Sequence, residues 1–329
     1  MALTPPAEVP LPRSSAAALD AAARTDPALH EPGLRAAFEA CRRLHAEHGK
    51  TYYLATLLLP PAKRPYVWAL YGFARYADEF VDSLTDPDPE ALVEWSEGFL
   101  KALEADGPTD PVGRAMAATM RRWEIPRAHV EAFLDSMRMD ITETGYATYE
   151  DLRRYVYGSA AVIGLQMLPV LEPVAPGAEG PAQALGEAFQ LSNFIRDVGE
   201  DLDRGRVYLP AEDLDAFGVT REDLLAARAA GTTPRAVREL LAFETARTRE
   251  LYAQAQPGLA MVHPTSRDCL RTAYELYGGI LDVVEAAGFD VVGRRVAVGV
   301  PRRLAVAVPG LVRARLARVR EARWQQLPG

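Results

Sequence analysis

The stretch QLSNFIRDVGEDLDRGRVYLP, residues 190–210, carries the pattern around which the rest of the chain is organised. As a helix it places Asn193, Asp197 and Asp201 at i, i+4 and i+8, so three oxygen-bearing side chains share one face. Apolar side chains flank that face at Phe194, Ile195 and Val198. Because like charges at i,i+4 destabilise a helix by about 0.2–0.5 kcal/mol, the ladder predicts that a cation binds here.

The composition is that of an ordinary globular protein. The 329 residues are 49% apolar and 25% charged, with a net charge of −8, which argues against a nucleic-acid partner. Cys41 and Cys269 are not at metal-binding spacing, so both are expected to be buried thiols in a reducing compartment. Without a secretory signal or an apolar run of about 20 residues, we expect a cytoplasmic protein, with peripheral membrane contact as an option.

Apolar residues recur at helical spacing along most of the chain, and no alternating strand pattern with hairpin turns is present. Helices are expected over residues 66–81, 111–123, 149–168, 181–203, 221–230, 234–255 and 265–287. The pattern therefore predicts an all-α protein built as a single large helical bundle.

Composition divides the chain into three segments. Residues 1–30, rich in Pro and Ala, are expected to form a flexible tail, and residues 31–305 the helical domain. Residues 306–329 are expected to form a basic helix or tail. The arginines of the C-terminal region, placed between short apolar runs such as Leu304–Val308, suggest contact with an anionic membrane, and a solvated terminal helix is the alternative.

A second acidic pair, Asp78 and Asp82, lies at i,i+4 near the end of the helix expected at 66–81. One such pair is commonly a solvated helix end, but two ladders on half-buried helices can face each other across a cavity. Carboxylate and amide oxygens suit Mg²⁺, which proteins hold together with substrate phosphates. Arg75 and Arg196 lie on the same helices, and a guanidinium suits phosphate. These features predict a Mg²⁺–diphosphate site inside an apolar bundle, and hence an isoprenoid substrate.

The two acidic motifs resemble those of the squalene/phytoene synthase family. They read Asp78-x-x-x-Asp82 and Asn193-x-x-Arg-Asp197-x-x-Glu-Asp201, and Arg-Gly-Arg-Val-Tyr-Leu-Pro follows the second. The sequence of the second motif is most similar to that of the bacterial phytoene-forming members.

Three further segments extend this resemblance over nearly the whole chain. His48-Gly-Lys-Thr-Tyr-Tyr resembles the family's His-Ser-Lys-Ser/Thr-Phe-Tyr, with Gly49 and Tyr52 as departures. The segment from Tyr155 to Gly164 resembles Tyr-Cys-x-x-Val-Ala-Gly-x-Val-Gly, with changes at Ser159 and Ala161. The third segment fits the closing helices more weakly and contributes Tyr277 and Arg294.

The resemblance implies an isoprenoid synthase bundle with a central active-site cavity. It implies head-to-head condensation of two geranylgeranyl diphosphates to phytoene through a cyclopropylcarbinyl diphosphate, in carotenoid biosynthesis. The implied cofactor is Mg²⁺, with Mn²⁺ as a substitute, and no NADPH is expected for phytoene formation. The partners expected are prenyl diphosphate substrates.

Each site residue takes a role from the motifs. The expected metal ligands are Asp78, Asp82, Asn193, Asp197 and Asp201. The expected catalytic residues are Asp78, Asp82, Asp197, Asp201 and Tyr155. The expected substrate-binding residues are Lys50, Tyr52, Arg75, Gln190, Arg196, Tyr277 and Arg294. Ser159, Ala160 and Gly164 either leave room for a prenyl chain or allow close helix packing, and the sequence does not separate these roles.

Three alternatives remain open at this point. A squalene, dehydrosqualene or hydroxysqualene synthase would use farnesyl diphosphate at the same kind of site. A class I terpene cyclase shares the i, i+4, i+8 metal triad, but its first motif usually reads Asp-Asp-x-x-Asp, from which Asp78-Glu79 departs. A helical scaffold without enzymatic activity would show no Mg²⁺-dependent release of diphosphate.

Overall fold

The structure, a computed structural model, describes residues 13–82 and 88–324, which form helices and contain no β-strand. The α-helices are α1 (Arg13–Ala23), α2 (Pro32–His48), α3 (Lys50–Thr56), α4 (Arg64–Asp82), α5 (Pro89–Ala102), α6 (Pro111–Trp123), α7 (Arg127–Thr142), α8 (Tyr149–Val156), α9 (Val162–Leu171), α10 (Glu179–Asp203), α11 (Ala211–Ala216), α12 (Arg221–Ala230), α13 (Arg235–Ala255), α14 (Pro264–Ala286) and α15 (Val300–Trp324). The predicted all-α class is confirmed.

Side-chain caps set where several helices begin. Asp88 and Asp110 start α5 and α6 by accepting a hydrogen bond from the backbone N–H of the third helical residue. Thr148 and Thr220 form capping boxes at the starts of α8 and α12. Each cap satisfies an otherwise unpaired N–H group and stabilises its helix by about 1 kcal/mol. At its other end, α10 stops just before Gly205, whose φ of +76° is a left-handed conformation that favours glycine.

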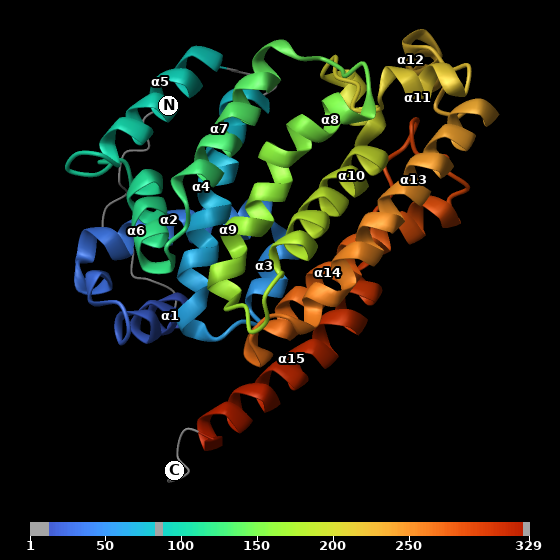
Figure 1. Cartoon of the computed structure of the whole chain (residues 1–329). Helices are drawn as coiled ribbons and strands as arrows, with labels where there is room; N and C mark the ends of the chain where they lie inside the picture. The colour runs from blue at the N-terminus through green and yellow to red at the C-terminus, as the bar shows by residue number, and fades with distance from the viewer. Residues whose placement is uncertain (1–12, 83–87, 325–329) are drawn as a thin grey trace.

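The helices pack in an order that places α4 and α10 near the middle of the bundle. Helices α2 and α6 pack on α4, whereas α13 and α14 pack on α10. Helix α9 lies beside α10, and α15 runs along α14 at the edge of the molecule (Figure 1). The two helices that carry the acidic ladders therefore belong to different halves of one bundle.

Each half has its own hydrophobic core. The core around α2, α4 and α6 includes the fully buried side chains of Phe38, Trp68 and Phe73. The core around α10, α13 and α14 includes Leu240 and Leu281. The burial of these large side chains is the main term that stabilises the fold.

Glycines bring α9 and the segment before it into backbone contact with α10. A methyl group added to Gly164 would lie 2.3 Å from the carbonyl oxygen of Ala182 in α10. A methyl group added to Gly186 of α10 would lie equally close, 2.3 Å, to the carbonyl oxygen of Ala160. Gly164 therefore serves close helix packing, one of the two roles that the sequence left open.

The helix expected over residues 149–168 is interrupted. Between α8 and α9 the backbone forms a π-helical segment, η3 (Tyr157–Ala161). Such segments are rare and often lie at functional sites, because the wider turn redirects side chains. The Ser159 hydroxyl within it is buried and has no hydrogen-bond partner among the described residues.

The N-terminal region differs from the expected flexible tail over the part that the structure describes. Residues 13–23 form α1, whose Leu19 is completely buried. The carboxylate of Asp26 accepts a hydrogen bond from the Tyr66 hydroxyl at 2.8 Å, which ties the segment to α4. Because this amphipathic helix buries one face on the bundle, it is ordered despite its Ala-rich composition. Residues 1–12 lie outside the described chain.

The C-terminal helix begins earlier than the boundary expected at residue 306. Helix α15 starts at Val300 and packs along α14, with Ala307 and Ala314 buried between the two helices. Residues 325–329 lie outside the described chain. Among the described residues, no helix combines the length and the apolar character that crossing a bilayer requires.

Candidate active site

The acidic ladder predicted from the sequence lies on one face of α10. Asn193, Asp197 and Asp201 are all partly buried there. Asp201 lies 3.9 Å from the guanidinium of Arg204, one turn further along. The side chains of these three residues are thus partly shielded from solvent.

Two arginines hold the carboxylate of Asp197. Arg196 Nε donates to Asp197 Oδ1 at 2.7 Å, and Arg295 Nε lies 2.8 Å from the same oxygen. Arg295 also lies 3.4 Å from Glu200. Arg294, which the sequence singled out, and Arg295 are both exposed, but the ion pair with Asp197 is made by Arg295, whereas Arg294 lies near Asp290. The sequence could not distinguish them because both follow α14 in an irregular segment whose path depends on tertiary contacts.

Burial and pairing act in opposite directions on Arg196. Desolvation opposes the charge on its guanidinium, but the hydrogen bond and the negative charge of Asp197 outweigh burial and raise the pKa. Arg196 therefore stays charged in a largely buried position. A fixed positive charge beside the ladder is suited to holding a diphosphate group.

The second acidic motif lies at the end of α4. Arg75 donates to Asp78 Oδ2 at 2.5 Å and also pairs with Glu79. The Nε of Arg75 is buried without a hydrogen-bond partner among the described residues. Asp82 is the last residue of α4, and its side chain lies outside the described part of the structure.

The ends of the two acidic helices are linked through one side chain. Arg206, in the turn after α10, lies within 3.5 Å of the Val81 carbonyl oxygen near the end of α4. The same guanidinium nitrogen donates to the Asp140 carbonyl oxygen of α7 at 3.3 Å. The predicted ladders of α4 and α10 therefore approach each other at their C-terminal ends.

Aromatic side chains fill the space between the two acidic helices. The ring of Tyr52 stacks on Tyr277 with centroids 4.5 Å apart, and Phe189 lies 4.5 Å from Tyr277. Burial raises the pKa of both phenols, and the charge of Arg196 opposes this shift at Tyr277. Both hydroxyls are accordingly neutral at pH 7 and able to donate hydrogen bonds.

The remaining predicted substrate-binding residues lie at the edge of this aromatic group. Gln190 lines the cavity described below, next to Phe189. Lys50 is exposed at the first position of α3, two residues before Tyr52. Of the predicted substrate-binding residues, Gln190 and Tyr52 therefore line the cavity, whereas Lys50, Arg75 and Arg196 are not among its lining residues.

Tyr155, expected to be catalytic, belongs to a group of side chains around Asp140 of α7. Its hydroxyl donates to Asp140 Oδ2 at 2.9 Å, and the Tyr208 hydroxyl donates to Asp140 Oδ1 at 3.2 Å. The ring of Tyr208 stacks on Phe194 of α10 with centroids 4.0 Å apart. Tyr155 and Tyr208 therefore both donate to the carboxylate of Asp140. Asp140 and Tyr208 had no role in the sequence analysis, although Tyr208 lies within the quoted motif.

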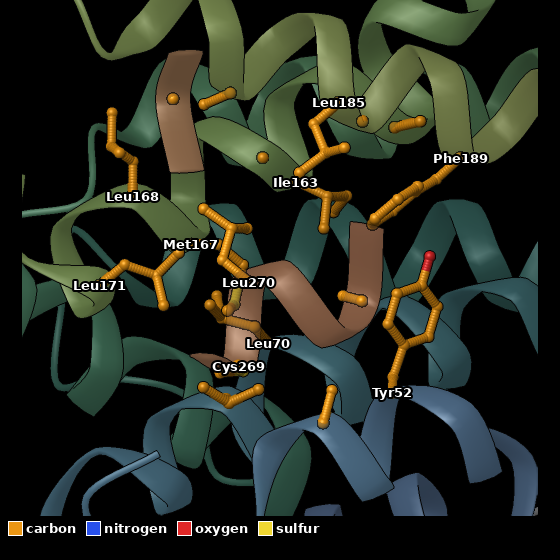
Figure 2. A pocket seen from close by; sticks show the side chains of 18 of the residues that line it. Tyr52, Leu70, Ile163, Met167, Leu168, Leu171, Leu185, Phe189, Cys269 and Leu270 are labelled. Carbon is orange, nitrogen blue, oxygen red and sulfur yellow. The ribbon is translucent and has the colours of Figure 1, made fainter. Parts of the chain in front are cut away.

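A cavity of about 280 Å³ extends from the aromatic group into the bundle. Its wall is almost entirely apolar and comes mainly from α3, α4, α9, α10 and α14. Figure 2 shows the lining side chains around one space, with Tyr52 and Phe189 on one side and Leu168 and Leu171 on the other. Ser159, Ala160 and Gly164 also line it, which fits the other role suggested for these small residues, room for a prenyl chain.

A buried histidine forms part of this cavity wall. His45 is fully buried, and neither ring nitrogen has a hydrogen-bond partner among the described residues. Its ring stacks on Tyr71 with centroids 4.2 Å apart. Burial lowers the pKa of the imidazole to about 3, so the ring is neutral at pH 7 and acts as part of the apolar wall.

The arrangement separates two chemical functions. One end carries carboxylates, arginines and neutral phenols, and the other accepts a long apolar chain. A site of this kind can hold a diphosphate at its mouth while it keeps a prenyl chain, and any carbocation formed from it, away from water. An all-helical bundle with such a site defines the class of isoprenoid synthases.

Comparison with known proteins identifies the family within this class. Residues 45–302 match the squalene/phytoene synthase family. The 15-cis-phytoene synthase of Synechocystis sp. is 37% identical over 282 residues, which cover 82% of each chain. The phytoene synthase of Arthrospira platensis is 35% identical over 306 residues, which cover 88% of this chain and 97% of that one.

Solved structures give the same result for the fold. A dehydrosqualene synthase superposes with a TM-score of 0.77 at 28% identity, covering 84% of this chain and 96% of that one. A squalene synthase from Alicyclobacillus acidocaldarius superposes with a TM-score of 0.72 at 27% identity, covering 83% and 99%. The chain belongs to the squalene/phytoene synthase family and is a prenyltransferase-type enzyme, as its motifs predicted. The chemistry of this family is the metal-dependent processing of prenyl diphosphates.

Proposed function

We propose that this chain condenses two molecules of geranylgeranyl diphosphate head to head into phytoene, as a step of carotenoid biosynthesis. The observation that carries the proposal is the apolar cavity, part of whose wall comes from α4 and α10, the two helices that bear the acidic residues and arginines. The similarity to 15-cis-phytoene synthases over most of the chain supports the same substrate and product.

The donor set fits a hard divalent cation, and we propose Mg²⁺, for which Mn²⁺ can substitute. Its ligands would be Asp78, Asp82, Asn193, Asp197 and Asp201. Among the described side chains no three His, Cys, Asp or Glu groups converge on one point, and Asp78 and Asp197 are paired with arginines instead. When bound, the cation supplies Lewis-acid neutralisation of the leaving diphosphate. Carboxylate and amide oxygens without any thiolate or imidazole favour Mg²⁺ over softer metals.

The arginines at the mouth bind the diphosphate groups of the substrates. Arg75 and Arg196 each point a guanidinium at an acidic ladder, and Arg295 approaches from the segment after α14. Their bidentate geometry orients phosphate oxygens and stabilises the negative charge that develops as the C1–O bond breaks. Gln190, which lines the cavity, and the exposed Lys50 would supply further donors to the diphosphates.

The reaction then proceeds in two ionisations. In the first, the C1–O bond of one substrate breaks to give an allylic cation and diphosphate. C1 of this cation bonds to the C2=C3 double bond of the second substrate, and loss of a proton closes the cyclopropane ring. The resulting cyclopropylcarbinyl diphosphate ionises in turn, rearranges and loses a proton to form phytoene. No reductant is consumed, so NADPH is not required.

The aromatic side chains protect these cations. Tyr52, Phe189 and Tyr277 present ring faces at the junction between the polar mouth and the apolar cavity. A ring face attracts a nearby cation by about 0.5–2 kcal/mol, more when water is excluded. Because burial keeps both phenols neutral, they stabilise the cations without capturing them as phenolates.

A second candidate is condensation of two farnesyl diphosphates to a squalene-type product. The superposition on a dehydrosqualene synthase favours it as the alternative, since the same site would serve a shorter chain. The two functions differ in how much of the cavity the prenyl chain fills.

One assay tests both candidates. The protein is incubated with C15 or C20 allylic diphosphate and Mg²⁺, with and without NADPH, and the hydrocarbon is identified by mass. We expect phytoene from the C20 substrate in the absence of NADPH. Formation of C30 products alone would replace the proposal by the second candidate.

A variant pair tests the acidic ladder. Asp197→Asn removes one charge from the proposed metal site and should reduce turnover by at least about a thousandfold, since charge stabilisation of the leaving group contributes several kcal/mol. The matched control is Asp203→Asn on the same helix, because Asp203 is more than half exposed and pairs with Arg228 outside the site. The assignment is wrong if Asp197→Asn retains the activity of the control at an unchanged melting temperature.

A further inference from the structure

Helix α15 exposes a continuous row of large apolar side chains. Of the large apolar residues that are exposed in the described chain, half lie on this one helix. They are Val300, Leu304, Val308, Val312, Leu316 and Val319, with exposed fractions from 50% to 64%. At 1.5 Å per residue this apolar row is about 30 Å long. A row of that size is unusual on a soluble surface and marks an interaction site.

The packing of α15 fixes the direction in which the apolar row faces. On the opposite side, Ala307 and Ala314 are buried against α14, and Arg313 Nε lies 2.7 Å from Asp268 Oδ1. Arg302 pairs in the same way with Asp282. Figure 1 shows α15 lying along α14 at the edge of the bundle. The apolar row therefore points away from the protein.

Positive charge is concentrated on the same helix. Residues 300–324 contain seven arginines and one glutamate, a net charge of +6 in a chain whose total is −8. Arg315, Arg320 and Arg323 are exposed beside the apolar row and form no ion pair with any described residue. The partner of this surface must accept apolar side chains and positive charges together.

The helix also lies close to the apolar end of the cavity. Cys269 and Leu270 of α14 line that cavity, and the adjacent Asp268 is the residue that binds Arg313. Gly310 of α15 packs against Thr272, one turn further along α14. Helix α14 thus lines the cavity and also contacts α15.

We propose that α15 docks the enzyme on the surface of an anionic lipid bilayer. The helix would lie in the plane of the interface, with its apolar row among the acyl chains and its arginines at the anionic headgroups. A second copy of this chain is a poorer partner for the row, because two helices of charge +6 repel each other at close range. The inference goes beyond the proposed reaction, and it places the apolar end of the cavity next to a hydrocarbon phase.

Vesicle flotation tests the proposal without any turnover, so its result is independent of the substrate. The full chain is mixed with vesicles of phosphatidylcholine alone or with phosphatidylglycerol added. We expect binding to the anionic vesicles that weakens as salt is raised, and at least tenfold weaker binding to the neutral ones. Equal binding to both, or none to the anionic vesicles, would overturn the proposal.

Two triple variants locate the binding surface. The first, Leu304→Gln, Val308→Gln and Val312→Gln, removes the centre of the apolar row and should weaken binding at least tenfold. The control changes three exposed apolar residues elsewhere, Val93→Gln, Val174→Gln and Leu225→Gln, and should bind like the parent. Equal binding by the two variants would overturn the proposal. So would a parent that fails to bind vesicles and forms a dimer which the first variant dissociates, because the row would then join two copies.

Discussion

The glycine contact between α9 and α10 makes a prediction whose magnitude follows from the structure. In Gly186→Ala, the new methyl group would lie 2.3 Å from the carbonyl oxygen of Ala160, whereas ordinary van der Waals contacts begin at 3.4 Å. The two backbones must therefore separate by roughly 1 Å. Overpacking of this kind costs about 1–3 kcal/mol. The atoms that the methyl group would meet belong to the backbone of Ala160 and Ala161, so they cannot move aside as a flexible side chain would.

Gly98→Ala is the matched control. Gly98 lies in the interior of α5, and a methyl group added there meets nothing within 4 Å. Replacement of a helical glycine by alanine in open space stabilises a protein by about 0.8–1 kcal/mol. The same gain is available at Gly186, so the difference between the two variants isolates the clash.

The assay is urea unfolding of both variants and the parent, followed by circular dichroism. We expect Gly98→Ala to raise the free energy of unfolding, and Gly186→Ala to fall below the control by about 1–3 kcal/mol. Because Gly186 and Ala160 both line the cavity, turnover of Gly186→Ala should fall as well. If Gly186→Ala is as stable as Gly98→Ala, the close approach of the helices is not real and the reasoning fails.

Two further predictions concern the cavity wall. His45 has a pKa of about 3 in the folded protein and about 6.5 in the unfolded chain. Between these values the unfolded chain binds one more proton than the folded protein, so the free energy of unfolding falls as the pH drops below 6.5, by at most about 1.4 kcal/mol per pH unit. His45→Phe should therefore lose less stability than the parent between pH 7.5 and about pH 5 in urea unfolding, and identical losses would contradict the buried neutral ring. Leu168→Trp enlarges a side chain on the side of the cavity opposite Tyr52 and should lower kcat/KM for the C20 substrate at least about tenfold relative to the C15 substrate. An unchanged ratio would mean that the prenyl chain does not reach Leu168.

The sequence was sufficient for the fold class and for the acidic ladder. Helical periodicity is a local property, so the spacing of apolar residues predicts α4 and α10 to within a few residues of their observed ends. The i, i+4, i+8 spacing of Asn193, Asp197 and Asp201 then fixes that they share one face, whatever the rest of the chain does. The two acidic motifs that resemble the family lie on these helices, and both fall within residues 45–302, which match the family.

Other features depended on contacts between residues far apart in the chain. The segment after α14 has no periodicity, so only its packing decides that Arg295 and not Arg294 reaches Asp197. The hydrogen bond between Tyr155 and Asp140 joins two helices, and no pattern along either helix indicates it.

The cavity is the clearest case of what tertiary structure alone decides. The sequence contains small and apolar residues on several helices, but the same residues could equally have packed together and left no cavity. Gly164 packs against the α10 backbone, and it also lines the cavity together with Ser159 and Ala160. Which role each residue takes depends on how the π-helical segment orients it between α7 and α10, and that orientation is set by packing across the bundle and not by local spacing.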